Sequence, residues 1–314
     1  MSIATTARLP LRPREGAGTP DTFIEEGPVG ESLVGSRMRG PLFEAAPGQL
    51  LIRTRRIAKL LVSEGKALRF ERLPEATPEA VANLVLGWGL SALLHQRGAL
   101  ALHASAVRIG ERGAALFLGA AGAGKSTLAR ACTLRGWHLL DDNTAAIGFS
   151  GDGGPVVYPG SMQAKLWPTF PRLLDGLASR PLGGTPERPK VAVDLGRSFW
   201  PAPVPVRRIY RLASASANQP RVEPIEGRNK FLLLLNNLAA AHLVPACLRS
   251  LDCFSAILST VSQTAMGTLQ VPRGLQGVED AVALVEQEMA VGARGRSSDQ
   301  ARPDCRERDA DGAR

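Results

Sequence analysis

The segment GAAGAGKS, from Gly119 to Ser126, limits the fold of this chain more than any other feature. It satisfies the pattern G-x-x-x-x-G-K-[ST], which is typical of the turn between a buried strand and a helix. The apolar run Ala114–Leu118 precedes it, and Lys125–Leu134 follows it as a short amphipathic helix that stops at Gly136. The sequence therefore predicts an α/β protein built around a strand–turn–helix unit.

The residues of this turn, which we call the phosphate cradle, are suited to hold phosphate. Gly119, Gly122 and Gly124 permit positive φ angles and close backbone approach, so that successive N–H groups can converge on phosphate oxygens. The N-terminal dipole of the helix points at the same anion. Lys125 adds a positive charge near the β- and γ-phosphates, and Ser126 offers a hydroxyl to Mg²⁺. A glycine-rich turn without a ligand is the alternative, and the flanking strand and helix argue against it. The predicted site for a nucleoside triphosphate with Mg²⁺ comprises Gly119, Ala120, Ala121, Gly122, Ala123, Gly124, Lys125, Ser126 and Thr127.

A histidine upstream is predicted to lie beside the phosphate cradle. The apolar runs Leu102–Ile109 and Ala114–Leu118 flank the turn GERG, which indicates a β-hairpin. Strand pairing then places His103 opposite residues near Ala120, although it precedes Gly119 by sixteen positions (119 minus 103). A histidine there can hydrogen-bond phosphate or tune a nearby carboxylate. The alternative is a structural histidine at the start of a strand.

Two aspartates follow the cradle helix. Asp141 and Asp142 end the segment WHLL, which is predicted to be a short buried strand. Ligands of α/β sheets bind at the carboxyl edge of the strands, so one carboxylate is predicted to hold Mg²⁺ and one to accept a proton from an attacking hydroxyl. Side chains alternate along a strand, so only one of the two is expected to face the γ-phosphate. A pair of solvated turn residues is the alternative interpretation.

Composition argues against several classes of protein. Of the 314 residues, 44% are hydrophobic and 21% are charged, which is ordinary for a soluble protein. The longest apolar run, Ala80–Leu94, falls short of the roughly 20 residues that span a bilayer, and the N-terminus lacks the apolar stretch of a signal peptide. The four cysteines are widely spread without a CxxC pair, which argues against a disulfide framework or a zinc site. We expect a cytoplasmic protein without a membrane span.

The net charge of +9 is uneven along the chain. Arg53–Arg72 holds seven Lys or Arg residues against two Glu residues. A solvated basic face is the simplest interpretation of this segment, and docking of an acidic peptide or protein is the second. The segment has little aromatic content and no motif that reads DNA or RNA, so no nucleic-acid partner is predicted.

The chain divides into four predicted parts. They are a disordered segment over 1–40, a small N-terminal subdomain over 41–76, a P-loop catalytic domain over 77–291 and a disordered tail over 292–314. A helix is predicted from Pro78 to about Gln96, with Thr77 as its cap and proline in its first turn. Residues 161–189 are expected to be loop and short helix, a long irregular stretch of the kind that often carries function.

Three segments together resemble the HPr serine kinase/phosphorylase family, and particularly its shorter relatives. They are RGALALHASAV, GAAGAGKST and RGWHLLDDN, and the resemblance extends over Leu90–Glu288. It implies a P-loop kinase core of HPr kinase type with a mixed sheet. It also implies an ATP- and Mg²⁺-dependent kinase that phosphorylates a serine hydroxyl of a peptide or protein. Relatives of this size resemble kinases that tailor ribosomal peptides, including lasso peptide precursors.

The resemblance also implies roles for individual residues. In that family the carboxylate next to the phosphates is a general base. Aligned without a gap through RGWHLL, the family's aspartate pair falls on Asp142 and Asn143. Asp142 is therefore the predicted base and, with Ser126, a predicted Mg²⁺ ligand. Asp141 is the alternative candidate for the base, and His103 is a further catalytic candidate. The sequence holds no convincing copy of the glycine-rich loop used in phosphorolysis, so it does not support phosphatase activity or HPr as the substrate.

Two other functions fit the same residues. A kinase of a small hydroxylated metabolite would use the same base and cradle, and a nucleotide-binding regulatory protein would turn over little nucleotide. His103 and Asp142 on either side of the cradle favour transfer to an acceptor over a nucleotide switch. The identity of the acceptor and the formation of a homo-oligomer stay open at this point.

Overall fold

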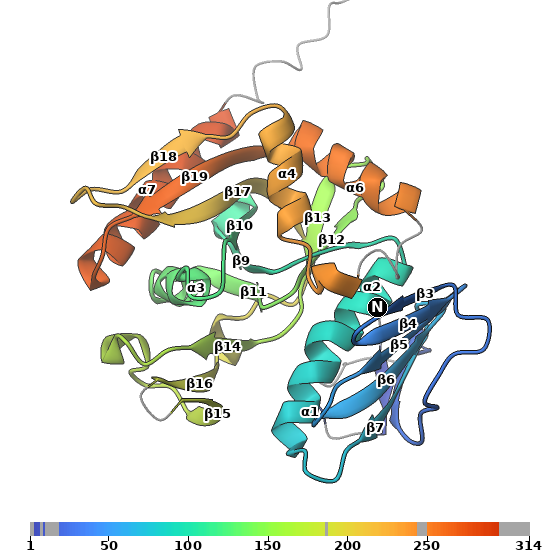
Figure 1. The fold of residues 1–314 in the computed structure, drawn as a ribbon. Helices are drawn as coiled ribbons and strands as arrows, with labels where there is room; N and C mark the ends of the chain where they lie inside the picture. Colours follow the sequence, from blue (N-terminus) through green and yellow to red (C-terminus); the bar gives the residue numbers. More distant parts are fainter. Residues whose placement is uncertain (1–2, 7–8, 10–18, 186–187, 244–249, 295–314) are drawn as a thin grey trace, which may run out of the picture.

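The fold is a mixed α/β structure with three β-sheets. In a computed structural model, residues 3–6, 9, 19–185, 188–243 and 250–294 are described. Figure 1 shows the N-terminal sheet in blue at the lower right, the central sheet above and to the left of it, and a small sheet below helix α3 (Lys125–Leu134). The predicted fold class is thus confirmed at the level of a mixed α/β protein.

The central sheet carries the phosphate cradle. Its strands are β8 (Leu100–Leu102), β9 (Ala104–Arg108), β10 (Ala114–Leu118), β11 (His138–Asp142), β12 (Ala145–Phe149), β13 (Pro155–Tyr158), β17 (Val204–Ser214), β18 (Arg221–Pro224) and β19 (Ala265–Val271). The helices α4 (Arg228–Asn236), α6 (Ser250–Gln263) and α7 (Leu275–Arg294) cover it together with α3. Strands β11, β10, β17 and β19 run in one direction, and β9 runs antiparallel between β11 and β10. The cradle and the end of β11 therefore lie at the same edge.

Side chains of the buried strand β10 alternate between two hydrophobic cores. Phe117 packs with α3 and α7 on one face, whereas Leu116 and Leu118 pack with α4 and α6 on the other. The predicted hairpin is confirmed for Ala104–Arg108, because β9 pairs antiparallel with β10 and Ala104 lies opposite Leu118. The predicted strand Leu102–Ile109 is not continuous, since Leu102 belongs to β8 and pairs with β12. This register brings the start of β9 to the cradle edge of the sheet.

The N-terminal sheet begins earlier in the chain than the sequence predicts. Its strands are β1 (Ile3–Thr5), β2 (Thr22–Glu26), β3 (Met38–Gly40), β4 (Phe43–Ala46), β5 (Gln49–Arg53), β6 (Ala58–Ser63) and β7 (Ala67–Arg72). The prediction of disorder over 1–40 is wrong for the part that is described, while residues 1–2, 7–8 and 10–18 lie outside it. The reason is that β2 pairs in parallel with the distant β7 and buries Thr22 and Ile24, which a local hydrophobic pattern does not reveal.

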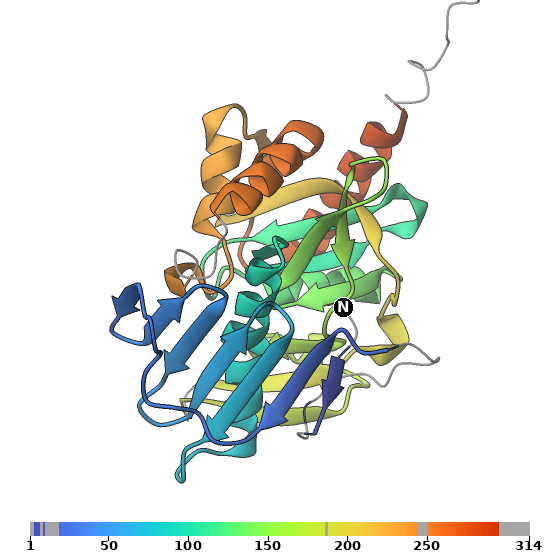
Figure 2. The same ribbon diagram turned by 90° about the vertical axis from the view of Figure 1, so that its right-hand side faces the viewer.

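The predicted helix over 78–96 is confirmed as a continuous helical stretch. It consists of α1 (Pro78–Leu84), a π-helical turn (Val85–Gly89) and α2 (Leu90–Gln96). Its N-cap is Thr77, whose Oγ1 accepts a hydrogen bond from the N–H of Ala80 at 3.2 Å. In Figure 2 the stretch lies between the N-terminal and central sheets, and it shares a hydrophobic core with the N-terminal sheet. The helix predicted to begin the catalytic domain thus covers the sheet that precedes it.

The stretch over 161–189 forms a sheet where loop and short helix were expected. Its strands are β14 (Gln163–Leu166), β15 (Ser179–Thr185) and β16 (Arg188–Asp194), in the order β14-β16-β15. A 3-10 turn, Pro171–Leu173, lies between β14 and β15. The sequence predicts only β16 as a strand, from KVAVDL. The other two strands depend on pairing with it, and β14 also buries Ala164 and Leu166 against the core around α3.

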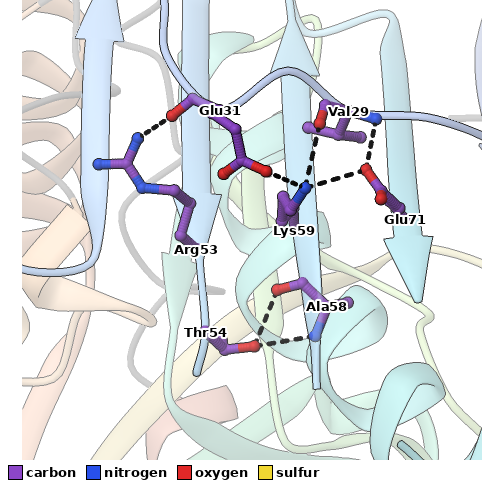
Figure 3. Close-up of polar contacts among 7 residues, drawn as sticks. All are labelled: Val29, Glu31, Arg53, Thr54, Ala58, Lys59 and Glu71. Atoms are coloured by element: carbon purple, nitrogen blue, oxygen red, sulfur yellow. Dashed lines mark hydrogen bonds and ion pairs between the residues drawn. The ribbon is translucent and has the colours of Figure 1, made fainter. Parts of the chain in front are cut away.

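The basic segment Arg53–Arg72 is largely neutralised within the N-terminal sheet. Lys59 Nζ lies 2.5 Å from a carboxylate oxygen of Glu31 and 3.3 Å from one of Glu71, as Figure 3 shows. Glu71 also accepts the N–H of Val29 at 2.8 Å. The other ion pairs of the segment are Arg53–Glu44, Arg69–Glu25 and Arg72–Glu26. Four of its seven basic residues are therefore paired, which weakens the interpretation of the segment as a docking surface for an acidic partner.

The C-terminal helix α7 continues to Arg294, past the predicted start of the tail at 292. The rest of the predicted tail, 295–314, lies outside the described residues. No helix in the described ranges is both long and apolar enough to cross a membrane.

Replacing the Thr77 cap tests the start of the helical stretch. Thr77→Ala removes the acceptor for the Ala80 N–H and should lower the free energy of unfolding by about 1 kcal/mol. Denaturant unfolding followed by circular dichroism measures this change. Thr77→Ser keeps the acceptor and serves as the control; equal destabilisation by both variants would contradict the capping role.

Candidate active site

The phosphate cradle joins the end of β10 to the start of α3. Gly119, Gly122 and Gly124 have φ angles of +149°, +84° and +95°, a region that favours glycine, and helix α3 begins at Lys125. The sequence-predicted turn is therefore present between a fully buried strand and a helix N-terminus. Its N–H groups and the helix dipole favour an anion at this position.

The Lys125 side chain lies along the cradle. Its Nζ donates hydrogen bonds to the carbonyl oxygens of Gly119 at 2.8 Å and Ala120 at 3.1 Å. Burial lowers the pKa of Lys125, while the negative charge of Asp142 raises it. A cation is thus present inside the turn, on the side of the carboxylate.

An extra residue in β11 determines which aspartate faces the cradle. Leu139 pairs with Val107 and Asp141 pairs with Ala106, so two positions of β11 advance against one of β9. Such a β-bulge reverses the alternation of the side chains that follow it. Without the bulge Asp141 would share the α3 face with Leu139; with it, Asp142 takes that face as the cross-strand partner of Ser105.

Asp142 is buried among hydrogen-bond donors of the site. The Ser105 hydroxyl donates to Oδ1, and the backbone N–H of Lys165 donates to Oδ2 at 2.9 Å. Burial raises the pKa of Asp142, and the hydrogen bonds from Ser105, Lys165 and the cradle residue Ser126 lower it. The carboxylate therefore lies next to the hydroxyl at the start of α3, as required of a group that acts on a cradle-bound phosphate.

Asp141 has a different environment. Its Oδ1 accepts the N–H groups of Asn143 and Thr144, and its Oδ2 accepts that of Ser161, each at 2.8 Å. Burial raises its pKa to about 7 against the opposing effect of these donors. Gly160 packs so closely that a Cβ there would lie 1.7 Å from Oδ2. Asp141 thus holds the turn after β11 against the segment before β14, and its oxygens are occupied by backbone donors.

His103 lies at the cradle edge, as the hairpin register predicts. Its backbone N–H donates to the Asn237 carbonyl at 2.8 Å, and its Nδ1 lies 3.1 Å from the Asn143 carbonyl oxygen. Burial, and then the charge of Lys125, lower the pKa of His103, which favours the neutral imidazole near pH 7. A cavity of about 550 Å³ is lined by His103 and by Gly119–Ala121 of the cradle.

The remaining walls of this cavity come from distant parts of the chain. Arg211 of β17 and Asn236 and Asn237 at the end of α4 line it, together with Trp88 of the π-helical turn and His242. The Trp88 and His242 rings meet edge to face, with centroids 4.5 Å apart. The sequence singles out no role for His242. Its place in the cavity depends on the contact between the N-terminal helical stretch and the segment after α4, for which the sequence holds no signal.

Three cations of the small sheet, two of them close to Asp142, were also missed from the sequence. Lys165 belongs to β14, Arg180 to β15 and Lys190 to β16, all within or beside the stretch expected to be irregular. Burial, and then the charge of Lys190, lower the pKa of Lys165, whereas Asp142 raises it. Lys165 Nζ donates to Asn83 Oδ1 of α1 at 3.0 Å. The alternation QAKLW was the one available signal that β14 is a strand.

The site suits a metal ion only if the ligand supplies part of the coordination. No group of three or more His, Cys, Asp or Glu side chains in the described part of the chain is arranged to hold a metal. Mg²⁺, however, is usually bound by one or two protein groups plus substrate phosphates. Asp142 and Ser126 are two neighbouring oxygen-bearing groups beside the cradle that could serve in this way.

Comparison with known proteins adds little to this geometry. No protein-family model matches the chain, and no curated protein matches it. Among solved structures it is similar to the Hpr(Ser) kinase/phosphatase from Coxiella burnetii, at 12% identity and a TM-score of 0.33. The match covers 63% of this chain and 97% of the other. A TM-score at this level carries no functional inference, so the site must be judged on its own contacts.

Replacing Asp141 should affect stability more than chemistry. Asp141→Asn places an amide N–H₂ among three backbone donors, so at least one N–H loses its acceptor. We expect a loss of about 1–3 kcal/mol in the free energy of unfolding. Thermal unfolding of the purified variant measures it, with Asp152→Asn, an exposed turn residue, as the control. Unchanged stability of Asp141→Asn would contradict the structural role.

Proposed function

We propose that this chain is an ATP- and Mg²⁺-dependent kinase that transfers the γ-phosphoryl group to a serine hydroxyl of a peptide or protein. The observation that carries the proposal is the buried Asp142 carboxylate beside the cradle. It combines with an anion-binding helix N-terminus and a buried lysine at the same sheet edge. A phosphate site alone suits many nucleotide-binding proteins, whereas a carboxylate held next to it suits proton removal from an acceptor.

In the proposed reaction the serine Oγ attacks the γ-phosphorus. The bond to the bridging oxygen of the β-phosphate breaks, ADP leaves, and the hydroxyl proton passes to Asp142. The donors on Asp142 hold its oxygens in place, because the Ser105 hydroxyl and the Lys165 N–H each contact a different oxygen. Lys125 balances negative charge on the β- and γ-phosphates. His103, being neutral, is a hydrogen-bond partner for phosphate or acceptor at the cavity wall.

Mg²⁺ would be held by Ser126 and Asp142 together with oxygens of the nucleotide. It would neutralise charge on the transferring phosphates. The cavity next to Gly119–Ala121 leaves room for a bound group on the side opposite α3. Serine in a peptide or protein is the proposed acceptor because the motifs around the cradle resemble those of serine kinases; a precursor of a ribosomal peptide is one such acceptor.

The proposed base is tested by Asp142→Asn. The variant keeps the shape of the side chain but removes the proton acceptor, so turnover should fall by roughly 10²–10⁴-fold. The affinity for ATP measured without Mg²⁺ should stay nearly intact, because the cradle and Lys125 are unchanged. The measurement is transfer of labelled γ-phosphate from ATP to serine-containing candidate peptides, with alanine versions as blanks. Asp141→Asn is the matched control and should lower turnover less. If Asp141→Asn is inactive and Asp142→Asn is active, the assignment of the base is wrong.

The cradle is tested by Lys125→Ala. Loss of the buried charge should abolish phosphoryl transfer and weaken ATP binding, because the phosphates lose their partner in a preorganised site. Transfer assays and ATP titration measure the two effects separately. Unchanged turnover would rule out this nucleotide site. If the wild-type protein hydrolyses ATP or phosphorylates a metabolite and yet labels no peptide, that result would contradict the peptide acceptor and favour one of the alternative functions.

A further inference from the structure

The small sheet carries three cations on one face. Lys165 on β14 and Arg180 on β15 both lie opposite Ala192 of β16. Lys165, Ala192 and Arg180 therefore form one row across the sheet, and their side chains point to the same face. Lys190 precedes Ala192 by two residues and therefore points to the same face. The opposite face, with Ala164, Leu166 and Val193, packs into the core around α3. We call Lys165, Arg180 and Lys190 the cationic face.

The cationic face differs from the basic segment of the N-terminal sheet in its pairing. There, four basic residues meet glutamates of the same sheet. For Lys165, Arg180 and Lys190 the described residues provide no ion pair: Lys165 binds the Asn83 amide oxygen and Arg180 the Gln163 amide oxygen at 3.0 Å. Asp142 offsets part of the charge of Lys165 and Lys190 without forming an ion pair with either. Like charges gathered without ion pairs repel one another, and an anionic ligand relieves that repulsion.

An exposed aromatic ring lies in the same face. Trp167 follows Lys165 by two residues on the β14 side, and its side chain is 39% exposed. Lys190 Nζ lies 5.6 Å from the centroid of its ring. A large aromatic beside unpaired cations is typical of a recognition surface, since it offers apolar contact area next to the charges.

We propose that the cationic face, with Trp167, binds an acidic segment of the peptide acceptor next to the serine that is phosphorylated. This deepens the proposed function and rests on it for the position of the serine. The Lys165 backbone N–H contacts the Asp142 carboxylate, so the face begins at the proposed base. A peptide that places its serine at Asp142 must therefore run beside these side chains.

The outer part of the face is too far from the cradle to serve the nucleotide. The strand order is β14-β16-β15, so two strand spacings separate Arg180 from Lys165, or about 10 Å between backbones. Helix α3, which begins at the cradle, contacts β14. Arg180, on the outer strand β15, therefore lies farther from the cradle than Lys165 does. Replacing Arg180 should therefore change peptide binding alone. Lys165 and Lys190 lie close enough to Asp142 to influence the binding of both the peptide and the nucleotide.

Peptide binding to the full chain, without nucleotide, tests the proposal. Two fluorescent serine peptides of equal length are compared by anisotropy, one with glutamates beside the serine and one with glutamines at the same positions. Wild-type protein should bind the glutamate peptide more tightly. Arg180→Gln and Lys190→Gln should each weaken that binding by about 2- to 5-fold, and leave the glutamine peptide unchanged, as expected for exposed ion pairs.

Arg172→Gln is the matched control. Arg172 belongs to the turn between β14 and β15, is exposed, and pairs with Glu279 of α7 rather than facing the cationic face. Its binding of the glutamate peptide should equal that of wild type. An equal loss in Arg172→Gln would show that only the overall positive charge is sensed and would overturn the proposal.

Other outcomes also overturn the proposal. Equal affinity of wild type for the two peptides does so, as does a preference that survives the Arg180→Gln, Lys190→Gln double variant. A single-stranded oligonucleotide of the same charge serves as a further probe. If it binds more tightly than the glutamate peptide, and if this binding is lost in the double variant, the face is a nucleic-acid site. Because the assay needs no turnover, failure of peptide phosphorylation with an intact glutamate preference would reject the kinase and keep the acidic-segment site.

Discussion

The bulge in β11 is the constraint on which the site depends. Because one extra residue is accommodated against β9, Asp142 turns to the face of the sheet that α3 covers, next to Ser105 and the first turn of the cradle helix. Asp141 is turned the other way and becomes the acceptor for three backbone N–H groups. Two neighbouring carboxylates with the same chemistry thus acquire separate tasks through backbone geometry alone.

The N-terminal part of the chain contributes to the site through its helical stretch. The stretch packs on the N-terminal sheet, yet Asn83 contacts Lys165 beside Asp142, and Trp88 lines the cavity next to the cradle. A helix that is anchored in one sheet therefore holds side chains of the others in place, which makes the first hundred residues part of the proposed active site rather than an appendage.

Much of the fold around the cradle could be predicted, because it is specified by local patterns. The glycines of the cradle, the hairpin that brings His103 near it and the Thr77 cap each follow from residues close in sequence. The parts that were predicted wrongly depend on distant partners. Strand β2 needs β7, and strands β14 and β15 need β16, so composition alone gave disorder for one and loop for the others. The charge balance was misjudged for the same reason, since the glutamates that pair with the basic segment lie on β2 and its neighbours.

The sequence by itself determined a phosphate cradle at the end of a buried strand, with a histidine and an aspartate pair nearby, because those features rest on spacing along the chain. Only the tertiary structure decided which aspartate faces the cradle, since that depends on register between β11 and β9. It alone also brought Lys165, Arg180 and Lys190 together and left them without an ion pair among the described residues. Strand pairing joins positions that are far apart in sequence, so no local pattern contains that information.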